Sequence, residues 1–354
     1  MCYRLEILGD ALLKFAISRE LYKICPDKRE GQLTKERTKF INNRKLCEVL
    51  LTTGMARYIR ALPLSLGERS LVFCPPGMPL KDDLSKCTVW CTDIMTTPAE
   101  VMYDKEKLFI YPRSQHQDGM VMFKKVADMA ESLIGAYYID RGEAAGIAVM
   151  KALGIWPGLS ASDETDEVQN TALPMLPTSS TLETDLDELE SRIGYKFQNR
   201  ALLRLALTHS SISSVVNYER LEFLGDSVLD FVEMSYWFRH KVSYDPMRLH
   251  DLKEKNVCNQ NLASKAYLLG VHKCIIHCSN PLQAMLDSYC AEQAELLSQP
   301  TTSSTSAMET DCSAQQAVTK LGKDGTCSVL ADTLEAIIGA IFLDCGEDTA
   351  LIEK

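Results

Sequence analysis

The chain has 354 residues, which is enough for about two domains, and its apolar fraction of 46% is ordinary for a globular protein. Its formal net charge of −10 disfavours a surface that is basic throughout, as contacts to nucleic-acid phosphates would need. No apolar run reaches the roughly 18 residues of a membrane span, and no signal peptide is visible. The 13 cysteines lack the spacing of a disulfide framework, so we expect reduced thiols in a cytoplasmic or nuclear protein without a membrane partner.

The first predicted element is a helix over residues 1–22, which ends before Pro26. Its apolar run YRLEILGD contains Glu6 and Asp10, which are four residues apart and therefore on one face of the helix. Two carboxylates this close repel each other unless a cation lies between them, so they are candidates for half of a metal site. A single pair of this kind is more often a solvated helix face, and the spacing alone does not decide between the two.

The rest of the first half contains a basic segment, an insertion and a closing helix. Residues 23–45 are rich in Lys and Arg, and a helix is expected there with Thr34 as its cap. This basic face could follow phosphates or simply be solvated. Residues 63–120 have few helix signals but keep aromatic and apolar side chains, which predicts an ordered insertion. Residues 141–156 are expected to form the closing helix.

A change of composition divides the chain. Residues 157–185 are rich in Ser, Thr, Asp, Glu and Pro and almost free of aromatic residues, which is typical of a linker. They separate a first domain at 1–156 from a second domain at 186–354. The second domain contains a polar insertion at about 298–325, which is expected to be disordered.

The acidic pair of the first helix returns in the second half. Glu222 and Asp226 lie in the run ERLEFLGD, at an offset of 216 positions (222 − 6) from their counterparts. A second helical element is repeated as well: ADMAESLIGA at 127–136 returns as ADTLEAIIGA at 331–340, at an offset of 204 positions (332 − 128). In each copy of this element an Asp and a Glu are three residues apart, again on one helical face. Repetition within one chain makes a solvated face a poor explanation.

Each half therefore offers four carboxylates on two helices. The eight candidate ligands are Glu6, Asp10, Asp128 and Glu131 in the first domain and Glu222, Asp226, Asp332 and Glu335 in the second. Hard oxygen ligands without Cys or His at matching positions suit Mg²⁺, with Mn²⁺ as a substitute, rather than zinc.

A glycine stands inside each of these four helices, although glycine costs about 1 kcal/mol relative to alanine in a helix interior. The four glycines are Gly9, Gly135, Gly225 and Gly339. Their repetition predicts that the two helices of each pair approach each other closely at these points.

The run ERLEFLGD followed by the pattern Ala-Asp-x-x-Glu, Ala or Ser, x-x-Gly-Ala resembles the paired signature of the ribonuclease III family, and two such units in one chain resemble the tandem arrangement of the Dicers. The resemblance covers most of both repeats. It implies an all-α fold of two tandem ribonuclease III-type helical domains that form an intramolecular pseudo-dimer rather than an obligate homodimer. A valley between the domains is expected to take double-stranded RNA, which is read by its shape and 2′-hydroxyls.

The function implied by this resemblance is Mg²⁺-dependent cleavage of double-stranded RNA into short duplexes with 3′ overhangs, in RNA silencing and small RNA production. The resemblance makes all eight carboxylates both metal ligands and catalytic residues, and we expect Glu131 and Glu335 to be the most sensitive. Each site is expected to cut one strand. RNA-binding proteins of a silencing complex are expected partners. Because the first domain lacks its opening helices and the second its closing helix, the chain is expected to be a fragment or an incomplete gene product.

The resemblance also identifies supporting residues and departures. Glu30, in a Glu-Gly pair, is similar to a glutamate that supports the metal site in this family, and Pro246 is its counterpart in the second repeat. Glu219 is expected to be supportive only, and its counterpart in the first repeat is Tyr3, a departure from the family pattern at the first site. Ser328 stands where the first repeat has a lysine, so the second domain is expected to lack one phosphate contact.

Other functions remain as alternatives. Ribonuclease III-like domains that bind RNA or a partner without cutting usually lose one or more of the four acids, whereas this chain keeps all eight. A helical di-metal oxidase would need Glu-x-x-His pairs, and none occurs in the sequence. The cluster formed by His272, Cys274, His277 and Cys278 has zinc-ligand composition, but an apolar segment rich in soft residues explains it more simply. The same holds for Cys87-x-x-x-Cys91.

Overall fold

The computed structural model describes residues 2–55, 100–104, 107–111, 123–157, 180–298 and 325–353. The chain divides into two compact units. The first unit comprises residues 1–10 and 39–156, and the second comprises residues 11–38 and 157–354. A segment of the first repeat, residues 11–38, thus belongs to the same unit as the whole second repeat.

Helices form the body of the first unit, and α5 is the central one because both α3 and α6 pack against it. The helices that contribute to this unit are α1 (Cys2–Ile24), α2 (Glu30–Ile41), α3 (Asn43–Thr52), α5 (Phe123–Arg141) and α6 (Glu143–Leu153). The helices predicted over residues 1–22 and 141–156 are confirmed as α1 and α6.

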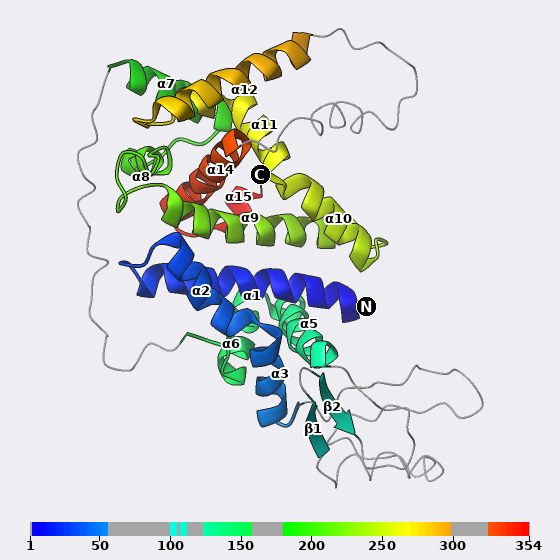
Figure 1. Cartoon of the computed structure of the whole chain (residues 1–354). Coiled ribbons are helices and arrows are strands. Elements are labelled where there is room, and N and C mark those ends of the chain that lie inside the picture. The colour runs from blue at the N-terminus through cyan, green and yellow to red at the C-terminus, as the bar shows by residue number, and fades with distance from the viewer. Residues whose placement is uncertain are drawn as a thin grey trace, which may run out of the picture. The chain divides into compact units, whose positions relative to one another are not determined.

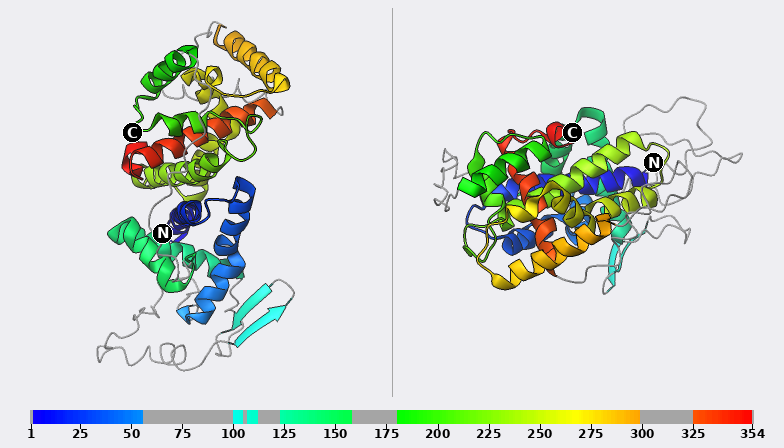
Figure 2. Two further views of the ribbon diagram at one scale, coloured as in Figure 1. Left: turned by 90° about the vertical axis from the view of Figure 1, so that its left-hand side faces the viewer. Right: turned by 90° about the horizontal axis from the view of Figure 1, so that it is seen from above.

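A short antiparallel hairpin belongs to the insertion of the first unit (Figure 2). Its strands are β1 (Glu100–Asp104) and β2 (Lys107–Tyr111), and they pair in the register that sets Val101 opposite Ile110. Most of the insertion predicted at 63–120 lies outside the described residues, so its predicted order stays a prediction.

In the second unit α14 is the central helix, and α8, α9 and α11 all pack against it (Figure 1). Its long apolar stretch explains this position, because residues such as Leu330, Ile337 and Phe342 are almost completely buried. Besides parts of α1 and α2, the unit contains α7 (Ser180–Ile193), α8 (Arg200–Ala206), α9 (Glu219–His240), α10 (Pro246–Val257), α11 (Asn259–Leu269), η3 (Val271–Lys273), α12 (Asn280–Ser298), α14 (Gly325–Asp344) and α15 (Thr349–Ile352).

Side-chain caps fix the beginnings of several helices. Asn42 accepts a hydrogen bond from the backbone N–H of Lys45 at the start of α3, and Asp245 accepts one from Arg248 at the start of α10. The predicted cap at Thr34 is wrong, because Thr34 lies inside α2 and its hydroxyl donates to Glu30 instead. The helix begins one turn earlier than its capping signal suggested.

The predicted all-helical class is confirmed for both units, with the hairpin as an addition in the insertion. The linker predicted at 157–185 lies largely outside the described residues, and its last part is helical because α7 begins at Ser180. The polar insertion predicted at 298–325 also lies almost entirely outside them. Among the described helices, none combines the length and the apolar character that a membrane crossing requires.

Candidate metal centres

The helices that carry the candidate ligands cross at the four glycines. A Cβ atom added at Gly9 would lie 1.8 Å from the carbonyl oxygen of Glu131, and one added at Gly225 would lie 1.8 Å from the carbonyl oxygen of Glu335. The partner glycines are as tightly placed, since a Cβ at Gly339 would lie 2.3 Å from a backbone oxygen. Any larger side chain must push the helices apart. The predicted close approach is confirmed, and the contacts at Gly9 and Gly225 involve the candidate ligands themselves.

In the first unit this crossing gathers three of the four predicted ligands. Carboxylate oxygens of Glu6, Asp128 and Glu131 all lie within 4.8 Å of one another, with Glu6 on α1 and the other two on α5. Asp128 and Glu131 are only 7% and 8% exposed. Asp10 falls outside this group, but its charge still acts on both Glu6 and Glu131.

The carboxylates of the first cluster concentrate negative charge in a buried place. Burial, followed by the charges of Asp10, Asp128 and Glu6, raises the pKa of Glu131 to about 9, and the positive charge of Lys124 only partly opposes them. Burial and Asp128 also raise the pKa of Glu6. One oxygen of Glu6 is buried without a hydrogen-bond partner, whereas the buried Oδ2 of Asp128 has the Nζ atom of Lys125 3.4 Å away. Buried carboxyl oxygens normally find partners, so the orphaned oxygen of Glu6 indicates that a ligand belongs beside it.

The second unit repeats the arrangement. Carboxylate oxygens of Glu222, Asp332 and Glu335 lie within 4.8 Å of one another, with Glu222 on α9 and the other two on α14. Burial raises the pKa of Glu335 to about 9, and Asp226, Glu222 and Asp332 add to the shift while Lys14 opposes it. Asp226 thus acts on this cluster as Asp10 acts on the first.

The surroundings of the second cluster differ from those of the first. Ser328 donates a 2.9 Å hydrogen bond from its hydroxyl to Asp332, one turn along α14. In the first unit Lys125 reaches the equivalent Asp128, with its Nζ atom 3.4 Å from Oδ2. Asp332 is therefore held by a neutral donor and Asp128 by a cation.

Two cations that the sequence analysis missed approach Asp226. The Nζ atom of Lys14, on α1, lies 3.0 Å from Oδ2 of Asp226, and an Nη atom of Arg37, on α2, lies 3.7 Å from the same oxygen. Both cations come from the segment 11–38 and so belong to the second unit. The spacing within one helix cannot reveal such partners, because Lys14 and Asp226 are 212 positions apart.

The sequence also left open which of the two metal sites Glu30 supports. Its charge acts on the second cluster, where it raises the pKa of Glu222 to about 8 together with burial and Asp332, both of which have larger effects. It acts on Asp332 as well. The resemblance predicted a supporting role for Glu30 without saying at which site, and this electrostatic coupling favours the second.

Both clusters fit a hard divalent cation. Their donors are carboxylate oxygens, and burial and mutual repulsion disfavour the charged form of these carboxylates. In the first cluster one oxygen of Glu6 also lacks a hydrogen-bond partner. Mg²⁺ prefers such oxygen ligands. The residues that would hold it are Glu6, Asp128 and Glu131 in the first unit and Glu222, Asp332 and Glu335 in the second, with Asp10 and Asp226 beside them.

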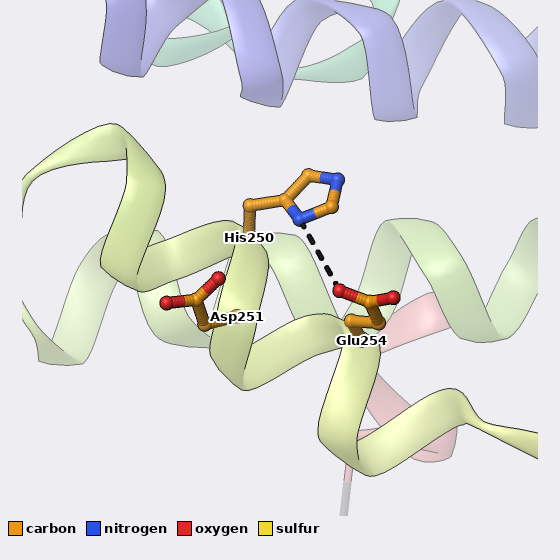
Figure 3. A group of neighbouring side chains, drawn as sticks. All are labelled: His250, Asp251 and Glu254. Atoms are coloured by element: carbon orange, nitrogen blue, oxygen red, sulfur yellow. Dashed lines mark ion pairs between the residues drawn. The ribbon is translucent and has the colours of Figure 1, made fainter.

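A third group of potential ligands lies on one face of α10. His250, Asp251 and Glu254 are all exposed, and the ring of His250 turns toward Glu254, with 3.8 Å between Nδ1 and the carboxylate (Figure 3). All three come from one helix, and two of them already form an ordinary surface ion pair one turn apart. This group needs no metal to explain it.

The soft residues near residue 275 have separate partners. The thiol of Cys274 is buried and points to backbone oxygens, Cys278 contacts the carbonyl of Ser211, and His272 stacks on Tyr267 with ring centroids 4.8 Å apart. Among the described residues they form no shared ligand group. These separate contacts favour the simpler interpretation, an apolar segment rich in soft residues, whereas Cys87 and Cys91 lie outside the described residues.

Comparison with known proteins gives consistent matches. The ribonuclease III domain family matches the chain at residues 3–142 and 219–346. Over its whole length the chain is 33% identical to Endoribonuclease Dicer homolog 1 of Arabidopsis thaliana, and over 81% of its length it is 33% identical to Endoribonuclease Dicer homolog 3 of the same plant. In both cases it spans 18% of the relative. The nuclease domain of ribonuclease III from Campylobacter jejuni is 30% identical over 48% of this chain and 94% of that one, with a TM-score of 0.32.

Proposed function

The chain belongs to the ribonuclease III family, and from this premise we propose that it is a divalent-cation-dependent endoribonuclease that cuts double-stranded RNA. The observation that best supports the proposal is the recurrence of one acidic cluster in each of the two family matches. Each cluster is gathered from two helices that cross at glycines, so the arrangement is built into the backbone. A solvated acidic face would not need such a crossing.

The chemistry is hydrolysis of a phosphodiester. When bound, Mg²⁺ supplies an activated water and stabilises the charge of the leaving oxygen in an in-line displacement, and Mn²⁺ is the expected substitute. Glu131 and Glu335 hold the ligand set together, since each is coupled to the two other acids of its cluster and to the aspartate beside it, Asp10 or Asp226. Their raised pKa values mean that they give up a proton readily only when a cation compensates their charge. They are therefore the residues on which cation binding depends most.

Basic side chains provide phosphate contacts near the clusters. Lys124 and Lys125 lie beside the first cluster and lower the pKa of Glu6. Near the second, an open hollow next to Glu219 is lined by Arg29 and Lys35 from the segment 11–38. These local charges answer the objection raised by the overall charge of −10, because phosphate binding needs basic residues only where the RNA lies.

The relatives named Endoribonuclease Dicer homologs extend the proposal. We assign to this chain the production of short RNA duplexes with 3′ overhangs, in which each cluster cuts one strand. Its place would then be small RNA production in RNA silencing, in the cytoplasm or nucleus, with RNA-binding proteins of a silencing complex as partners. The division into domains at 1–156 and 186–354, joined by a linker, belongs to the same proposal.

The test is cleavage of a labelled RNA duplex by the purified chain, with Mg²⁺ and with a chelator. The control is the double variant Glu131→Gln/Glu335→Gln, which keeps the shape of both side chains and removes both charges. We expect cleavage by the unaltered chain only with the cation, and none by the double variant. Binding of the duplex without any cleavage would instead support a module that binds RNA but does not cut it. Cleavage that survives the double substitution would disprove the proposal.

A further inference from the structure

Two phenylalanines at equivalent positions of the repeats pack on each other. Phe15 and Phe231 are 216 residues apart (231 − 15), the same offset that relates Glu6 to Glu222. Both belong to the second unit, where their rings stack with centroids 4.8 Å apart and planes 2° apart, and both are almost fully buried. A residue that packs on its own counterpart marks a local two-fold relation, here between the segment 11–24 of α1 and helix α9.

The neighbouring position carries opposite charges in the two repeats. Lys14 and Asp230 are also 216 positions apart, and the Nζ atom of Lys14 forms a hydrogen-bonded ion pair with the carboxylate of Asp230. The Asp230 side chain is only 8% exposed and that of Lys14 22%. The pair therefore lies next to the stacked phenylalanines and is mostly buried.

Lys14 and Asp230 each have oppositely charged neighbours that stabilise their charged forms. Lys14 lies between two carboxylates, since its Nζ atom is also 3.0 Å from Oδ2 of Asp226. Burial alone would raise the pKa of Asp230, yet Lys14 and Lys253 lower it. Lys253 on α10 contributes a second ion pair, with its Nζ atom 3.0 Å from the carboxylate. Lys14 is thus paired with carboxylates of the second repeat, and Asp230 is paired with Lys14 of the first repeat and with Lys253 of its own.

The position of these residues decides which surfaces can pair. If the segment 11–24 met a second copy of itself in the same geometry, Lys14 would face Lys14, and if α9 met a second α9, Asp230 would face Asp230. Like charges at a mostly buried position are strongly unfavourable. The phenylalanine is the same in both repeats and would permit all three pairings, so the discrimination comes from the charges.

We propose that the Lys14–Asp230 pair is a specificity device that makes the first repeat pair with the second repeat of its own chain and rejects self-pairing with a second copy of either repeat. The proposal concerns pairing and does not rest on the proposed catalytic function. It predicts that reversing one charge destabilises the pairing within the chain and allows pairing with a second chain that carries the complementary reversal.

The test uses two charge-reversed variants of the full chain, Lys14→Asp and Asp230→Lys. In each variant alone the natural pair becomes two like charges, so we expect a lower Tm than that of the unaltered chain. When the two variants are mixed, the aspartate introduced into the first variant can meet the lysine introduced into the second. The unaltered Lys14 of the second variant can likewise meet the unaltered Asp230 of the first. Light scattering after size-exclusion chromatography should then show a one-to-one heterodimer that neither variant forms alone.

The swapped variant Lys14→Asp/Asp230→Lys keeps the test decisive if the single variants unfold. It should be monomeric and recover at least half of the Tm lost by the worse single variant, since only the contacts to Asp226 and Lys253 stay mismatched. The matched control is Lys23→Glu, which reverses a half-exposed pair with Glu347 in the same unit and should change Tm little and form no heterodimer with either variant. Additive losses of Tm in the swapped variant, or a mixture that stays monomeric while both single variants are folded, would overturn the proposal.

Discussion

The two acidic clusters share their carboxylates and their glycines but differ in the cations that reach them. In the first cluster Lys125 pairs with Asp128, from the same helix and less than one turn away. In the second cluster Lys14 and Arg37 reach Asp226 from α1 and α2, more than 180 positions away in the sequence (226 − 37 = 189). The equivalent of Asp128 there is held by a serine. Lys125 of the same helix thus partly compensates the charge of the first cluster, and Lys14 and Arg37 of the other repeat partly compensate that of the second.

This difference teaches that repetition of a motif does not repeat its environment. The second cluster receives Glu30, Lys14 and Arg37 from the segment 11–38, so its charge balance depends on how the first repeat packs within the second unit. A change in that segment should therefore act on the second cluster, whereas changes in α5 should act on the first.

The largest effect should come from the acids with the highest pKa. We expect Glu131→Gln and Glu335→Gln each to weaken Mg²⁺ binding at their own cluster by about 100-fold or more, because a ligand charge is lost and not merely reoriented. Isothermal titration calorimetry of the single and double variants would measure this. The control is Glu254→Gln, on the exposed face of α10, which should leave Mg²⁺ binding unchanged. If Glu254→Gln weakened Mg²⁺ binding as much, the assignment of the clusters would be wrong.

The glycine crossings should be nearly as sensitive. Gly225→Ala introduces a Cβ that the structure places 1.8 Å from a backbone oxygen, so we expect the free energy of unfolding to fall by about 3 kcal/mol and the second cluster to lose its cation. Gly9→Ala should do the same at the first cluster. The measurement is chemical denaturation together with Mg²⁺ titration.

A third glycine separates this packing effect from helix propensity. Gly31 lies on α2, and a Cβ there would meet nothing within 4 Å. Gly31→Ala should therefore be neutral or stabilise the chain by up to about 1 kcal/mol. Equal destabilisation by all three substitutions would contradict the crossing argument.

The raised pKa values predict how stability depends on pH when no divalent cation is present. Glu335 keeps its proton up to about pH 9 in the folded chain, but loses it near its ordinary value of 4.5 when unfolded. The unfolded state therefore binds fewer protons in this window, and the contribution of Glu335 to stability is lost as pH rises from about 4.5 to about 9.

The measurement is Tm as a function of pH with a chelator, for the unaltered chain and for Glu335→Gln. The glutamine cannot ionise, so the variant should lose less stability between pH 5 and pH 9, by a difference of a few degrees in Tm. Added Mg²⁺ should reduce the loss in the unaltered chain. Identical pH profiles for the two chains would show that Glu335 is not buried among like charges.

The smallest effect should come from the basic residues near the second cluster. Arg29→Ala and Lys35→Ala should each weaken binding of a duplex modestly and reduce the slope of log affinity against log salt by about 1. Filter binding at several concentrations of a monovalent salt, with a chelator instead of Mg²⁺ to prevent cleavage, would measure the slope. Lys196→Ala is the control, since Lys196 is exposed between α7 and α8. A flat salt response in the unaltered chain would argue against phosphate contacts.

Local spacing made part of the fold and site predictable. Glu6 and Glu222, and Asp128 and Asp332, could be paired by their offsets, and the glycines predicted the crossing that the structure confirms. The partners of Asp226 could not be found in this way, because they depend on the packing of segments far apart in the chain. One signal was available: Lys14 and Asp230 carry opposite charges at the same repeat position. Thr34 failed as a cap because a Ser or Thr inside a helix can bond one turn back just as well.

The most direct test of the whole account is to remove one aspartate from one cluster and to follow both RNA strands. Asp332→Ala and Asp128→Ala each take one ligand from one cluster and leave the other cluster intact, and a duplex labelled differently on its two strands reports the cut in each. The account predicts that each variant nicks one strand only and that the two variants spare opposite strands. Cleavage of both strands, or of neither, by either variant would contradict it.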